Sequence, residues 1–142
     1  MANANAVCNS FKRELLVGTH NFTLTTGDQF KLALYTSSAT YGATTTVYSS
    51  TNEVTGTGYT AGGEILTNVT PTLDTSTGIT DFADKTWSTS TITARGAMIY
   101  NFSKANAAVV TLDFGSDKIS SAGDFTIQFP APAAATAIIR IA

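Results

Sequence analysis

The sequence predicts a mainly β protein: a single antiparallel β-sandwich or jelly-roll-like barrel with one N-terminal α-helix. Short segments that alternate apolar and polar residues recur from residue 28 onward, and clusters of Gly, Ser, Thr and Asp separate them. Helical spacing of apolar residues is confined to residues 1–18. A length of 142 residues is near the usual size of one domain and suffices for one core. We therefore expect a single domain over 1–142, with a helix or arm over 1–18 and the sandwich over 28–142.

The predicted helix lies at the start of the chain. Asn9 or Ser10 can cap it, Phe11 and Leu15 recur at helical spacing, and Gly18 accepts the left-handed conformation that ends helices. Two roles fit this pattern. The helix closes one end of the core, or it is an arm that docks on a neighbouring subunit, in which case Phe11 and Leu15 are its contact residues.

Eight further segments have the character of strands, and turn-forming clusters at 74–78 and 120–123 separate some of them. The segments are 30–34, 65–69 with a stop at Pro71, 79–82, 86–88, 91–102, 109–114, 125–129 and 137–141. In the segment 91–102 alternate residues predict one core face, which consists of Ile92, Ala94, Gly96, Met98, Tyr100 and Phe102.

Residues 37–63 differ from the rest of the chain, because they are rich in Thr, Ser and Gly and poor in aliphatic residues. The pattern predicts an extended loop with short edge strands that does not anchor the core. Tyr41, Tyr48 and Tyr59 are its candidate interface residues, since tyrosine is enriched at protein interfaces. The alternative is that these tyrosines pack on the sheet edge of their own subunit.

The charged fraction is 13%, about half of the roughly 25% that is typical of soluble domains. Thr, Ser, Ala and Gly take the place of charged residues, and such a surface loses little side-chain entropy when a partner covers it. The composition therefore favours a protein that works against protein neighbours. The eight Lys and Arg residues are scattered, no apolar run reaches bilayer length, and the start lacks the order of a signal peptide. We expect no nucleic-acid partner and no membrane partner.

Residues for catalysis, cofactor binding or metal binding are not predicted. His20 is the one histidine and Cys8 the one cysteine, so a zinc site or a Ser-His-Asp unit has too few partners. Cys8 also cannot form a disulfide within the chain. The aspartates lack the spacing of a calcium loop and do not form a supported catalytic pair. The sequence therefore predicts a protein that is not an enzyme.

Several stretches carry a resemblance to a known group of proteins: NSFKRELLVGTHNF, FKLALYTSSA, GTGYTAGG, DFADKTWSTSTITARGAMIYN, LDFGSDK and IIRIA. Together they cover almost the whole chain, and they resemble small virion structural proteins of tailed bacteriophages, related sequences being familiar from phages of aquatic bacteria. The resemblance implies a virion component that is assembled in the bacterial host cytoplasm. The favoured role is a capsid decoration (cement) protein, commonly a trimer, whose partner is the major capsid protein.

Two other roles within a virion remain open under this resemblance. One is a tail or neck component that forms a ring, an adaptor or part of a fibre, with tail proteins as its partners. The other is a receptor- or glycan-binding tip, in which exposed tyrosines stack on sugar rings.

Overall fold

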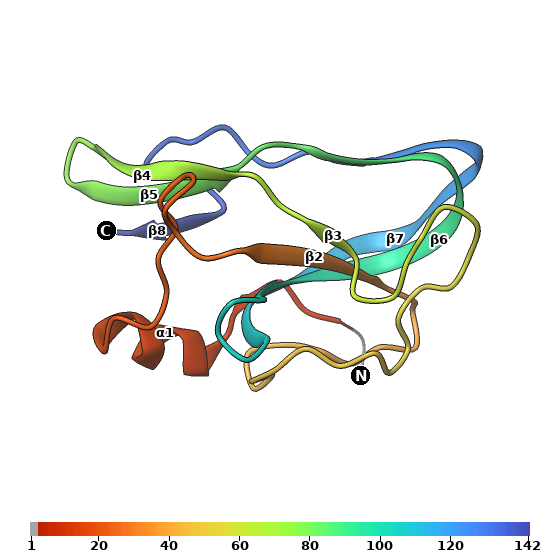
Figure 1. The fold of residues 1–142 in the computed structure, drawn as a ribbon, viewed down its shortest axis with the longest axis horizontal. Helices are drawn as coiled ribbons and strands as arrows, with labels where there is room; N and C mark the ends of the chain where they lie inside the picture. Colours follow the sequence, from red (N-terminus) through yellow and green to blue (C-terminus); the bar gives the residue numbers. More distant parts are fainter. Residues whose placement is uncertain (1–2) are drawn as a thin grey trace.

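A computed structural model describes residues 3–142 as two packed antiparallel sheets with one short helix (Figure 1). The larger sheet has the strand order β1-β7-β6-β2-β3 and the smaller sheet has the order β4-β5-β8. This arrangement confirms the mainly β sandwich with an N-terminal helix, and within the described residues neither sheet closes into a barrel. The elements are β1 (Ala6–Val7), α1 (Asn9–Leu16), β2 (Phe30–Tyr35), β3 (Glu64–Ile65), β4 (Asn68–Asp74), β5 (Thr77–Phe82), β6 (Lys85–Asn101), β7 (Ala107–Ile127) and β8 (Ile139–Ile141).

The strands β6 and β7 form one long hairpin of the larger sheet, and its bent end extends alongside the smaller sheet. In Figure 1 the two strands run through the lower layer, bend at the right-hand end and return along the top. The sequence predicted shorter, separate strands with a turn at 120–123, and that prediction is wrong. Residues 120–123 lie inside β7. Ala122, at a φ of 47°, forms part of a bulge there, and the bulge bends the strand without ending its pairing with β6.

Two buried serines stabilise the bend. The hydroxyl oxygen of Ser90 lies 2.9 Å from that of Ser120, 3.1 Å from the carbonyl oxygen of Trp87 and 3.0 Å from that of Gly123. Ser120 in turn accepts from the backbone N–H of Ile92 at 3.2 Å. The regular ladder is shifted in register on both sides of Ser90, so these side chains pair backbone groups that the ladder leaves unpaired.

Replacement of Ser90 by alanine is expected to lower the free energy of unfolding by about 1–3 kcal/mol, because one of the two carbonyl groups next to its hydroxyl loses its donor. Urea unfolding followed by circular dichroism measures the change. Ser88→Ala is the matched control, since Ser88 is exposed on the same strand and its loss is expected to have little effect. Equal effects of the two substitutions would contradict the role given to the serine pair.

The core is two-sided along the second half of β6. Ile92 and Ala94 are buried and alternate with exposed threonines as predicted, but every residue from 96 to 101 is buried. Both faces are covered here: Tyr100, on the predicted face, stacks on Tyr48, and Asn101, on the opposite face, is hydrogen-bonded to His20. Phe102 was predicted to be in the core, and this is wrong: β6 ends at Asn101, and the Phe102 ring lies half-exposed under the ammonium of Lys31.

Helix α1 ends as the sequence predicts and begins differently. Gly18 has a φ of 76° and donates its N–H to the carbonyl of Leu15 at 3.1 Å. The N-cap is Cys8 rather than Asn9 or Ser10, and no side chain caps the first turn. The Cys8 thiol is fully buried, and burial together with the nearby charge of Glu14 raises its pKa to about 11, so it stays protonated at neutral pH.

The smaller sheet contains a proline inside a strand. The sequence predicted that a strand would stop at Pro71, but β4 continues to Asp74. The prediction is wrong because β4 is an edge strand, where a missing N–H costs no ladder bond, and its register shifts between Val69 and Thr72, on either side of the proline.

Candidate functional site

The two predicted contact residues of the helix differ in their availability to a partner. Phe11 is buried, with its ring centroid 4.8 Å from that of His20 and 5.9 Å from that of Phe22. The predicted interface role of Phe11 is therefore corrected: its side chain packs in the core of its own subunit. Leu15 is half-buried and lines an apolar groove between α1 and the smaller sheet. The helix thus serves the core with one face and leaves other side chains for contacts.

The three candidate tyrosines of the loop 37–63 point into their own subunit. Tyr41 donates its hydroxyl to the carbonyl of Thr51 at 2.8 Å, and both Tyr48 and Tyr59 donate to Glu53. Their rings are half-buried against the core. The structure therefore favours the second reading of the sequence, in which the tyrosines pack on their own sheet. Tyr35 and Tyr100 join them, so all five tyrosines of the chain lie in one cluster.

Glu53 is the centre of this cluster, and sequence reasoning missed it. It is only 8% exposed, and one carboxylate oxygen accepts from Tyr59 at 2.5 Å and from the N–H of Gly62 at 2.7 Å. The other oxygen accepts from Tyr48 at 2.6 Å. A buried carboxylate is stable when its lone pairs are satisfied in this way. Glu53 and the tyrosines therefore hold the segment 37–63 to the core, whereas the sequence predicted an extended loop that does not anchor the core.

The tyrosine cluster makes the fold sensitive to alkali. Burial, and then the charge of Glu53, raise the pKa of Tyr100 to about 12. Burial and the hydrogen bond to Glu53 raise the pKa values of Tyr48 and Tyr59 as well, and burial with the charge of Glu53 raises that of Tyr35. A tyrosine whose pKa is raised in the folded protein contributes its full stabilisation at pH values below about 10, the pKa of tyrosine in the unfolded chain. This contribution is lost as the pH rises above that value.

These tyrosines are expected to ionise together with unfolding above about pH 10, and not before it. Tyrosinate absorbance and near-ultraviolet circular dichroism, recorded in one alkaline titration, measure the two events. Titration of most tyrosines near their ordinary pKa in a protein that keeps its native dichroism would contradict the cluster.

His20 has a structural environment. Its Nε2 lies 2.5 Å from the carboxylate of Glu14 and its Nδ1 lies 2.9 Å from the amide of Asn101, which also donates to Asp28 at 2.8 Å. These bonds tie helix α1 to the end of β6. Within residues 3–142 no group of three or more His, Cys, Asp or Glu side chains is placed to hold a metal ion. The described part of the chain also has no helix with the length and apolar character that a bilayer span requires.

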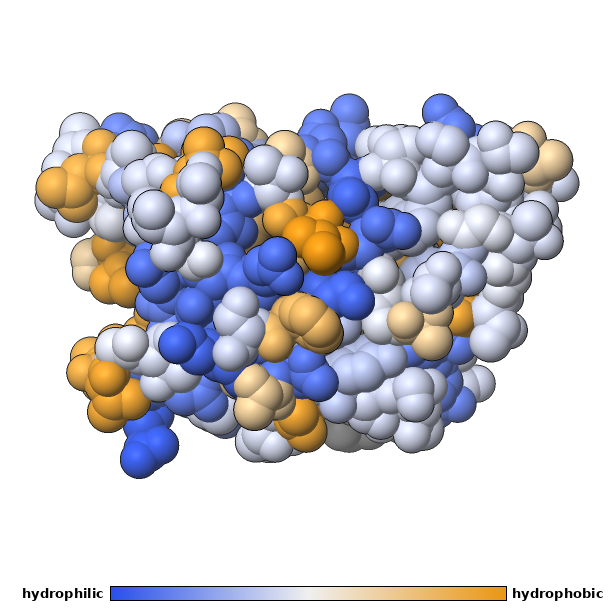
Figure 2. Space-filling model, in the orientation of Figure 1, coloured by the Kyte–Doolittle hydropathy of each residue, from blue (hydrophilic) through white to orange (hydrophobic). Residues whose placement is uncertain are grey.

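Exposed apolar side chains gather at one end of the molecule, which we call the end surface. It consists of Leu16, Val17, Leu73 and Ile141, which are 89%, 64%, 74% and 61% exposed. Ile141 lines an apolar groove of about 220 Å³ between α1 and the smaller sheet, and Leu16 and Leu73 directly follow Leu15 and Thr72, which also line it. In Figure 2 several hydrophobic groups lie at this end, on the left, a further one lies near the centre of the visible face, and much of the right-hand part is pale. Exposed apolar side chains that gather in this way mark contact sites.

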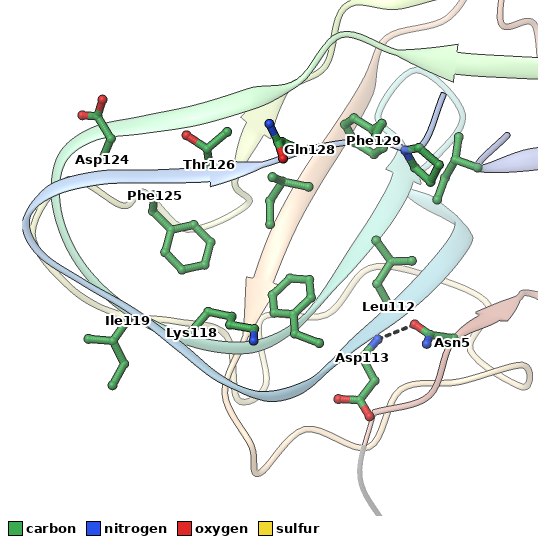
Figure 3. A pocket seen from close by; sticks show the side chains of 14 residues that line it. Asn5, Leu112, Asp113, Lys118, Ile119, Asp124, Phe125, Thr126, Gln128 and Phe129 are labelled. Atoms are coloured by element: carbon green, nitrogen blue, oxygen red, sulfur yellow. Dashed lines mark hydrogen bonds between the residues drawn. The ribbon is translucent and has the colours of Figure 1, made fainter. Parts of the chain in front are cut away.

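A second groove, of about 530 Å³, opens along β7, and we call it the flank groove. It lies between the two limbs of the bent strand, with Phe125 pointing into it and Asp124 pointing outward from its rim (Figure 3). The less exposed apolar lining residues are Leu112, Phe114, Phe125, Ile127, Phe129 and Ile138, all but Phe125 half-buried, and the exposed Ile119 and Pro130 complete the apolar lining. The outer edge of β7 borders this groove, since β1 pairs only with Val110 and Thr111.

Comparison with protein-family models, with curated proteins and with solved structures finds no match for this chain. Two apolar surfaces, on the end and on the flank, are suited to contacts between proteins.

Proposed function

We propose that this protein is a non-enzymatic structural component of a bacteriophage virion, and specifically a decoration protein that stabilises the assembled capsid shell. The observation that carries the proposal is the end surface, where Leu73 and Ile141 stand exposed beside an apolar groove. Water-exposed aliphatic residues of this size are stabilised when a partner covers them. The charge-poor, threonine-rich composition supports the same conclusion, because it favours surfaces that are covered in use.

The choice of a phage particle rests on the resemblance of the sequence to virion structural proteins. In this role the protein binds the closed shell and not its separate parts, so the free energy of binding adds to the stability of the shell. The major capsid protein is the proposed partner, and the virion is the proposed location after assembly in the bacterial host cytoplasm. Leu73 and Ile141 form the proposed contact with the shell.

The experiment that tests this function is quantitative mass spectrometry of purified virions, with binding of the recombinant protein to undecorated shells. We expect on the order of tens to hundreds of copies per particle, because a shell repeats each contact many times. A ring of about six or about twelve copies would favour the tail or neck role instead. Absence from the particle would exclude both roles.

Leu73→Glu is expected to weaken shell binding at least about tenfold, because it places a charge in an apolar contact. Ser88→Glu is the control, since it adds the same charge at an exposed site on β6. Unchanged binding of the Leu73 variant would move the contact away from the end surface. A glycan array tests the receptor-binding role separately, and specific binding there would favour that role.

A further inference from the structure

We draw no further inference here: the strongest candidate, the apolar flank groove along β7, has no net charge that would select a partner, and nothing in the structure shows what covers it.

Discussion

Replacement of Gly63 by alanine is expected to destabilise the protein by about 3 kcal/mol or more, because the added methyl group has no space. A Cβ at this position would lie 1.8 Å from the carbonyl oxygen of Leu32 and 2.8 Å from the Cα of Ala33. Both contacts are to backbone, so no side-chain rotation relieves them. Gly63 also has a φ of 73°, which alanine adopts only under strain.

The position matters because Gly63 directly precedes β3, which pairs with β2 at Leu32 and Glu64. The clash would separate β3 from the sheet and with it the loop 37–63. Gly115→Ala is the matched control: its φ is 79°, but no atom lies within 4 Å of the added group. This control is expected to cost about 1 kcal/mol from backbone strain alone. Urea unfolding measures both, and equal losses would show that the close approach at Gly63 relaxes.

Replacement of Glu53 by alanine is expected to cost about 3–5 kcal/mol, because it leaves two tyrosine hydroxyls and the N–H of Gly62 without their acceptor. The lost methylene contacts add a smaller part. The loop would then come away from the sheet, and protection of its amides from hydrogen exchange would fall. Thermal unfolding and hydrogen exchange measure the two effects.

Glu53→Gln separates hydrogen bonding from charge in this cluster. The amide oxygen can still accept from Tyr59 and Gly62, and the amide nitrogen can donate to the hydroxyl of Tyr48, which then reverses its role. The expected loss is about 1 kcal/mol, as charge-assisted bonds become neutral ones. A loss as large as that of the alanine variant would show that the negative charge itself is required.

The sequence was informative where one local pattern decides the structure. Alternation in 30–34 and in 91–95 predicted strands, and Gly18 predicted the end of the helix, because these features depend on neighbours in the chain. The strand at 30–34 was expected to be half-buried, and this is wrong, since Ala33 is buried together with Leu32 and Leu34. The local pattern failed where contacts between segments far apart in the chain decide the structure. The sequence at 120–123 has the composition of a turn, yet Ser120 is held by Ser90, whose position is set by the pairing of β6 with β7.

The candidate site shows the same division. The tyrosines of the loop 37–63 were recognised as unusual, but their direction depends on Glu53, a single acidic residue in a polar stretch with no local signal of burial. Its only clue was the presence of tyrosines on both sides of it in the chain. The end surface was equally hidden, since Leu16, Leu73 and Ile141 lie on separate elements that meet only in the fold.

The hairpin of β6 and β7 also has a consequence for the order of folding. Its first rung joins Asn101 to Ala107 across a short turn, so closing it requires the ordering of few residues. Pairing can then extend outward rung by rung, and the bend at Ser90 directs the two ends of the ribbon into opposite layers before β2 or β5 has found its place. We expect the transition state for folding to contain this ribbon, with φ-values highest around Ile99 and Val110 and lowest in β8.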